Sequence, residues 1–168
     1  MTLRQTLAGL MLLVLSVTIS GCGARNTQAP PTGSITIKPT SISWAVSVLP
    51  ATYTYESELM TVAVSGSNGL PLAGVYVTLT LDLSSSTSTS PVMNMYTLNP
   101  LTNPTTAVPL SSPVELKTDN NGNVVVWIYM ATGNGVAYKG YLNAVSGALS
   151  TQASITVTCT PSGATTCP

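Results

Sequence analysis

The feature that most constrains this chain is an alternation of apolar and polar residues, which runs from residue 34 to residue 158. In residues 74–83, one face carries Val and Leu and the other carries Thr and Asp. Successive side chains of a strand point to opposite faces, so this period predicts half-buried β-strands. No window after residue 22 has the period of an amphipathic helix. We therefore predict one all-β domain over residues 34–158.

The number and spacing of the predicted strands favour a two-sheet sandwich. Turn residues separate the strands, and the less regular region 84–113 contains one short strand near residues 93–98. Seven or eight short antiparallel strands with turns at this spacing imply an antiparallel β-sandwich. The main strands are expected at residues 35–37, 44–48, 59–64, 74–83, 114–118, 123–130, 136–145 and 149–159.

The first residues have the pattern of a secretory signal. Arg4 precedes an apolar run, residues 7–19, that is shorter than the ~20 residues a membrane-spanning helix needs. The run ends in Ile19-Ser20-Gly21-Cys22, which resembles the lipobox of bacterial lipoproteins. The resemblance implies a signal peptide over residues 1–21, a diacylglycerol on the Cys22 thiol and a membrane as the first partner. The alternative is an ordinary cleavage site and a free secreted protein.

The resemblance also implies an address in the cell envelope. Gly23 follows Cys22, where lipoproteins retained in the inner membrane often have aspartate, so an outer-membrane or cell-surface location is favoured. Residues 23–33 are small, polar and proline-rich, and together with Cys22 they are interpreted as a flexible linker.

The remaining cysteines, Cys159 and Cys167, form an even pair in an oxidising compartment. We expect a disulfide between them that closes a C-terminal tail, residues 159–168. Two thiols are too few to hold a metal, and the chain has no histidine to supply further ligands. The sequence therefore predicts no metal and no cofactor.

Two turn motifs carry a second resemblance. Gly69-Leu70-Pro71-Leu72-Ala73-Gly74-Val75 and Thr118-Asp119-Asn120-Asn121-Gly122 resemble the turns of bacterial Ig-like domains of the invasin/intimin type. In that family the second motif is a hairpin, and residues 141–157 are similar to the last hairpin of the family. The resemblance covers residues 34–158 and implies an Ig-like β-sandwich.

Three polar groups were weighed as sites. Asp119, Asn121 and Asn123 alternate like the start of a calcium loop, but Val124 and Met130 stand where an EF-hand needs Gly and Glu, so a turn is favoured. Glu56 and Glu58 are close carboxylates and are interpreted as solvated residues at a strand entry. Serine catalysis needs a base, and no histidine is present, so we predict that the chain is not an enzyme.

A possible binding face is formed by Val125, Trp127 and Tyr129. If Val124, Val126, Ile128 and Met130 face the core, these three point outward from one strand. An exposed Trp–Tyr stripe suits a sugar or a partner protein. Alternatively, aromatic residues simply suit strands, or the region 84–113 folds over the stripe.

The sequence thus predicts a lipid-anchored, non-enzymatic domain that acts in adhesion, envelope structure or surface-complex assembly. A carbohydrate-binding module and an accessory subunit of an envelope enzyme are the alternatives. Only 6% of residues are charged, and Lys plus Arg number five in all, so nucleic acid is not expected as a partner.

A Cys22→Ala variant tests the anchor. We expect the native chain to lose residues 1–21, to gain acyl mass and to partition with membranes, because two acyl chains anchor a protein stably. The variant should do none of these, and intact mass with membrane fractionation measures both. A soluble, unacylated native chain would contradict the assignment.

Overall fold

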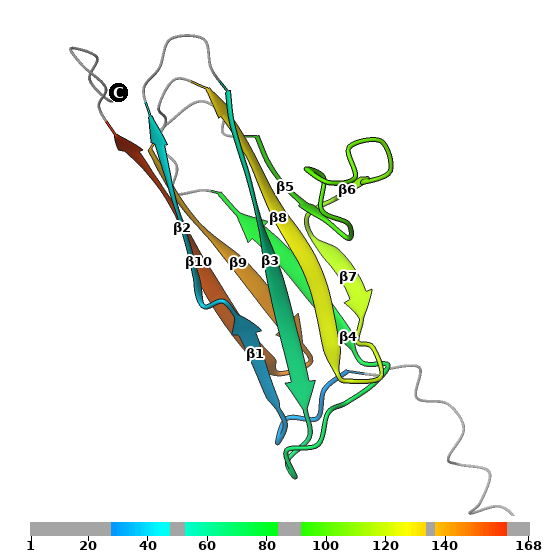
Figure 1. Ribbon diagram of the computed structural model, residues 1–168. Coiled ribbons are helices and arrows are strands. Elements are labelled where there is room, and N and C mark those ends of the chain that lie inside the picture. The colour runs from blue at the N-terminus through cyan, green and yellow to red at the C-terminus, as the bar shows by residue number, and fades with distance from the viewer. Residues whose placement is uncertain (1–27, 48–52, 84–91, 134–136, 161–168) are drawn as a thin grey trace, which may run out of the picture.

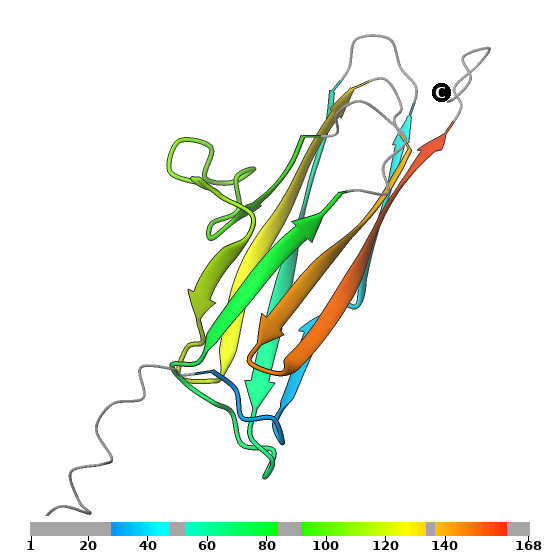
Figure 2. The same cartoon turned by 180° about the vertical axis from the view of Figure 1, so that it is seen from behind.

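The computed structural model describes residues 28–47, 53–83, 92–133 and 137–160, and these form an all-β sandwich (Figure 1). Two sheets of five strands each pack face to face, and Figure 2 shows the second sheet from behind. Within the described ranges, no helix is long and apolar enough to cross a membrane.

The first sheet, sheet I, contains the long strand β3 (Tyr53–Ser65). The strand β8 (Asn123–Gly133) lies between β3 and β5 (Val92–Tyr96). All neighbours in this sheet run antiparallel. Its order is β1 (Ser34–Lys38), β3 (Tyr53–Ser65), β8 (Asn123–Gly133), β5 (Val92–Tyr96) and β6 (Pro109–Leu110).

The second sheet, sheet II, begins with the strand that follows β1 in the chain. This strand, β2, runs parallel to β10, whereas the other neighbours are antiparallel. The order is β2 (Ser41–Ser47), β10 (Leu149–Thr160), β9 (Tyr138–Ser146), β4 (Tyr76–Asp82) and β7 (Val114–Lys117).

The strand order confirms the predicted Ig-like sandwich. The run β1-β3-β8-β5 matches the order of strands A, B, E and D in an immunoglobulin domain, and β10-β9-β4 matches G, F and C. The described residues form ten strands where the sequence indicated seven or eight. The short strand predicted near residues 93–98 is β5, whereas the two-residue strand β6 in the same region of weak pattern was not predicted. Two residues give too little alternation to recognise a strand from sequence.

The core lies between the sheets and is filled by aliphatic side chains and methionine. The apolar positions of residues 75–83 all face it, as predicted, with Val77 and Leu79 fully buried. Burying a Val, Leu, Ile or Met side chain contributes about 1.5–3 kcal/mol, so these positions account for much of the stability. The largest fully buried side chains are Met60, Leu79, Met95, Ile128, Met130, Leu142 and Ile155.

The chain enters the sandwich earlier than the sequence indicated. Residues 28–33 were assigned to the flexible linker, but Ala29 is only 5% exposed and belongs to the core cluster. Its backbone N–H donates to Ser146 Oγ at 3.0 Å, and Ser146 Oγ donates to the Tyr76 carbonyl at 2.6 Å. A proline-rich segment shows no period, so this attachment is visible only in the tertiary structure.

The two turn motifs meet at the same end of the sandwich. Thr118 is buried, its Oγ1 donates to the Leu72 carbonyl at 2.6 Å, and it accepts from the Val75 N–H at 2.9 Å. Gly122 has a φ of +73°, and a Cβ there would lie 2.6 Å from the Val64 carbonyl oxygen, so only glycine fits.

The second motif is not a hairpin, and that expectation was wrong. β7 belongs to sheet II and β8 to sheet I, so residues 118–122 form an arch between the sheets. Sequence alone cannot distinguish the two, because the same tight turn serves both connections.

Replacing Thr118 by valine tests this joint. Thr118→Val keeps the shape but leaves the Val75 N–H and the Leu72 carbonyl without their partner, which costs about 1–3 kcal/mol. Urea unfolding should show this loss, whereas Thr36→Val, at an exposed position of β1, should change stability little. Equal effects of the two substitutions would contradict the role of Thr118.

Candidate binding face on sheet I

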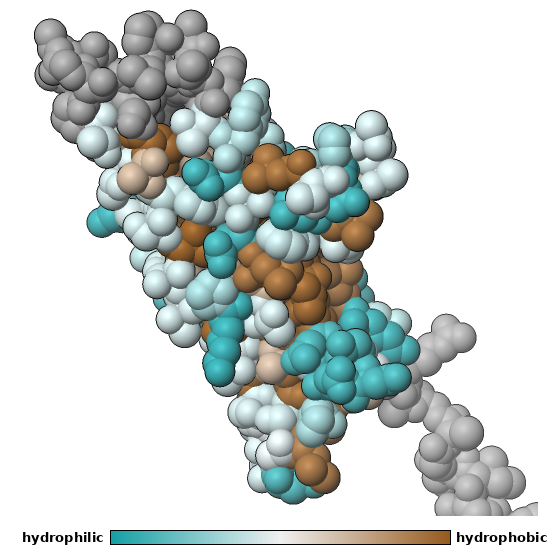
Figure 3. Space-filling model, viewed as in Figure 1, coloured by the Kyte–Doolittle hydropathy of each residue, from teal (hydrophilic) through white to brown (hydrophobic). Residues whose placement is uncertain are grey.

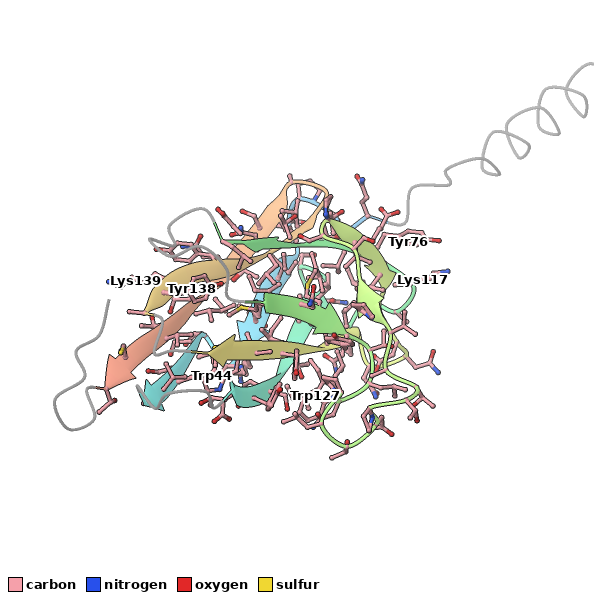
Figure 4. The ribbon with its side chains drawn as sticks, turned by 90° about the horizontal axis from the view of Figure 1, so that it is seen from above. Trp44, Tyr76, Lys117, Trp127, Tyr138 and Lys139 are labelled. Carbon is pink, nitrogen blue, oxygen red and sulfur yellow. The ribbon has the colours of Figure 1, made fainter. Side chains whose placement is uncertain are left out.

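The strand β8 separates core residues from surface residues by strict alternation. Val124, Val126, Ile128 and Met130 are at most 3% exposed, as predicted. Val125, Trp127 and Tyr129 therefore point to the outer side: Val125 is 42% exposed, and the two aromatic side chains are half-buried. In Figure 4, Trp127 lies on the side of sheet I away from sheet II.

Neighbouring strands extend this stripe into a wider surface. Leu59 of β3 and Tyr96 of β5 flank Trp127 in the sheet register, and Tyr55 lies further along β3. The sequence analysis did not identify these three residues. The alternation along residues 55–59 could have placed Tyr55 and Leu59 on one side of a strand, but it carries no signal for Tyr96. We call the whole set the aromatic face: Tyr55, Leu59, Tyr96, Val125, Trp127 and Tyr129.

Tyr129 is the centre of a small ring cluster. The Tyr55 ring stacks on it with centroids 6.4 Å apart and planes at 19°, and the Tyr96 ring meets it edge-on at 5.7 Å. Burial, and then the neighbouring Tyr55 and Tyr96, raise the pKa of the Tyr129 phenol. Tyr129 therefore keeps its proton and remains a hydrogen-bond donor at physiological pH.

A loop, residues 97–108, lies over part of the aromatic face. Ser57 Oγ of β3 donates to Asn99 Oδ1 at 3.2 Å, and because β3 and β5 lie on opposite sides of β8, this bond reaches across β8. Asn99 Oδ1 also accepts from the Leu101 N–H at 2.9 Å. The expectation that the region 84–113 could fold over the stripe is thus met in part, at Ser57, which pairs with Tyr129 in the sheet.

The face and the loop over it are uncharged, and Lys38 of β1 lies beyond Thr61 on the same side of sheet I. At the described outward positions of β3, β8 and β5, and in the loop, the residues are apolar, aromatic, hydroxyl or amide. The loop adds the exposed side chains Leu98, Leu101 and Val108. Figure 3 shows this side of the molecule, with apolar side chains gathered over β8 beside the loop. Such a surface can bind by apolar and hydrogen-bond contact without desolvating a charge.

A shallow depression borders the face at its lower end. Its volume is about 290 Å³, and Val125 and Thr97 line it beside Lys117 and Asp119. Lys117 Nζ itself lies 5.6 Å from the Tyr76 ring centroid, over the ring. Charges therefore lie at the rim of the surface and not within it.

Glu56 and Glu58 lie on the core side of β3. They alternate with Met60 on this side, and both are half-buried. Within the described residues, β3 has no sheet neighbour beyond β8 over residues 53–60, since β1 pairs only with residues 61–65. An inward-pointing charge on such an open edge opposes the addition of another strand.

Asp119 acts in a turn. Its Oδ1 accepts from the Asn121 and Asn123 N–H groups, each at 2.8 Å, as the turn interpretation requires. Across the described ranges, no group of three His, Cys, Asp or Glu side chains could hold a metal ion.

Tyr138 is a buried titratable group with no catalytic geometry. Its hydroxyl donates to Met93 Sδ at 3.2 Å, and burial, followed by the Asp82 charge, raises the pKa of the phenol well above its usual range.

The lipid and disulfide sites lie mostly outside the described residues. Residues 1–27, including Cys22, and residues 161–168, including Cys167, are not described. Cys159 is half-buried near the end of β10. Its pairing with Cys167 stays a prediction.

No protein-family model and no curated protein matches this chain. Among solved structures, the PapD-like domain 7 of human CEP192 is 10% identical over 80% of this chain and 90% of its own, with a TM-score of 0.41. The D00-D0 domain of intimin is 15% identical over 83% of this chain and 51% of its own, with a TM-score of 0.38. A family 123 glycoside hydrolase from Clostridium perfringens is 14% identical over 76% of this chain and 27% of its own, at 0.42.

These three proteins differ in kind, and their TM-scores are all below 0.5. The likenesses therefore carry no argument about activity or partners. The Ig-like architecture of this chain rests on its own strand order, and its function must be argued from the aromatic face.

Proposed function

We propose that this chain is a lipid-anchored, non-enzymatic Ig-like domain of the bacterial cell envelope, which acts by contact in adhesion, envelope structure or surface-complex assembly. The observation that carries the proposal is the aromatic face: an uncharged surface of Tyr, Trp, Leu and Val on the outer side of sheet I. Aromatic residues are enriched where proteins bind one another, because they offer large apolar area and a polar atom.

The anchor part of the proposal is supported by the sequence and by the way the chain enters the domain. Ile19-Ser20-Gly21-Cys22 supplies the lipobox-like site, and Ala29 is already held by Ser146. At the other end of the sandwich, a Cys159–Cys167 disulfide would close the tail. An outer-membrane or cell-surface location belongs to the same proposal.

The ring geometry favours a protein partner over a sugar. A sugar stacks on an open ring face, but the Tyr129 ring has Tyr55 stacked on it and Tyr96 against it. Side chains stand roughly perpendicular to a sheet, so this cluster presents ring edges and hydroxyls outward. Such a surface fits the mixed apolar and polar contacts of a protein interface.

Introducing a charge into the face tests the proposal. The complex is measured by native mass after membranes are gently solubilised. Val125→Lys should reduce the amount of the complex, because an unpaired lysine buried in an interface is strongly unfavourable. We expect at least a tenfold loss of the complex, or about 1.4 kcal/mol.

The matched control is Val145→Lys. Val145 is 41% exposed against 42% for Val125, but it lies on β9 in sheet II. If both substitutions reduce the complex equally, or neither does, the aromatic face is not the contact surface.

The carbohydrate-binding alternative is favoured by Trp127, whose indole lies at the same surface. If the face binds carbohydrate, a neutral polysaccharide should quench tryptophan fluorescence. Trp127→Ala should abolish the quenching, because the remaining tryptophan, Trp44, is only 9% exposed and cannot contact the sugar. An unchanged affinity in Trp127→Ala would exclude the alternative. A role as accessory subunit of an envelope enzyme would use the same protein contact and requires no catalytic residue in this chain.

A further inference from the structure

We propose that the aromatic face binds a second copy of this chain, side by side with it on the same membrane. This inference rests on the proposed anchor and contact function, and it names the partner. The pairing is isologous: the same face of each copy meets the other across a two-fold axis that runs along the long dimension of the sandwich.

The length of the linker restricts how two copies can be oriented. Ala29 is held in the domain, and six residues lie between it and Cys22, so the two can be at most about 25 Å apart when the linker is fully extended. Ala29 is bonded to Ser146 at the β9–β10 turn, and this turn and the arch at residues 118–122 lie at one end of the sandwich (Figures 1 and 2). That end therefore lies next to the membrane.

An inverted partner cannot reach the same membrane. The strand β3 alone has 13 residues, and at a rise of about 3.3 Å per residue it spans roughly 40 Å. A copy turned upside down would hold its Ala29 about that far from the bilayer, beyond the reach of its own linker. Two anchored copies must stand in the same direction, and a face on the side of the sandwich is then free to meet its equivalent.

The charge distribution permits this contact. The aromatic face itself carries no charge at its described positions; the charge beside it on the outer side of sheet I is Lys38 of β1, which pairs with Thr61, the neighbour of Val125. The whole sequence has five basic and five acidic residues, and removal of residues 1–21 takes away only Arg4 among them. A protein with net charge near zero does not repel its own copies.

Among the described residues, six of the ten exposed large apolar side chains lie on β3, on β8 or in the overlying loop, whereas Tyr76, Tyr141 and Val145 lie on sheet II. Tyr55 is 52% exposed and Leu59 39%, and the overlying loop adds Leu101 at 46% and Val108 at 68%. A contiguous exposed patch of this kind marks an interaction surface. Confinement to a membrane raises the effective concentration of each copy, so a modest surface is sufficient for pairing.

The face, and not the open edge of β3, is the contact. Glu56 and Glu58 point inward along residues 53–60, where edge-to-edge pairing would bring the two copies of each carboxylate together. The pairing therefore uses side chains across two outer sheet surfaces and adds no strand to either sheet.

Cross-linking of the full-length, membrane-anchored chain tests the inference. Val125→Cys in native membranes is treated with a short bis-maleimide, and the product is identified by intact mass. We expect a covalent dimer of twice the chain mass, whereas Val145→Cys and the unaltered chain should give at least tenfold less. Adding Leu59→Lys to Val125→Cys should lower the dimer yield at least tenfold, because Leu59 is in the face and away from the reacting thiol.

The outcomes separate this inference from the proposed function. A cross-link from Val125→Cys to a different envelope protein overturns self-association but supports the contact function. Equal yields from Val125→Cys and Val145→Cys also overturn self-association. If, in addition, Val125→Lys leaves the native complex unchanged, the proposed contact function fails with it.

Discussion

The burial of one side of β8 is the constraint on which the rest of the structure depends. This strand lies between β3 and β5, and Val126, Ile128 and Met130 on its inner side are not exposed at all. A shift of register by one residue would exchange the two sides and expose this part of the core. Trp127 and Tyr129 are therefore held outward by the packing of their neighbours, and the aromatic face follows from the core.

The hydrogen bonds of Ser146 and Thr118 lie at the end of the sandwich where the chain enters it. Ser146 holds Ala29, and Thr118 holds the segment from Leu72 to Val75 through its hydroxyl and backbone. These bonds join residues far apart in the chain and bring the entry of the domain to the same end as the arch between the sheets. A lipid on Cys22 would therefore hold this end of the sandwich within the reach of the linker.

The low charge of the chain shapes the outer surface of sheet I. The described outward residues of sheet I between β3 and β5 are neutral, and hydroxyl and amide groups keep the surface solvated. Glu56 and Glu58 lie on the inner side of the open edge of β3. Lys117 and Asp119 line the depression beside the face, and Lys38 lies on the outer side of β1. A neutral sheet surface of this kind can meet another protein without the cost of desolvating ions.

The sequence by itself determined the local features: the strands of residues 74–83 and 123–130, the inward and outward sides of each, and the sandwich class. These follow from alternation, which depends only on neighbouring residues. The tertiary structure alone decided that the rings of Tyr55 and Tyr96 contact Tyr129, and that Asn99 reaches Ser57 across β8. It also decided that Ala29 belongs to the core and that residues 118–122 form an arch between the sheets. Each of these contacts joins residues about 30 or more positions apart, and a single sequence carries no periodic signal for contacts at such separations.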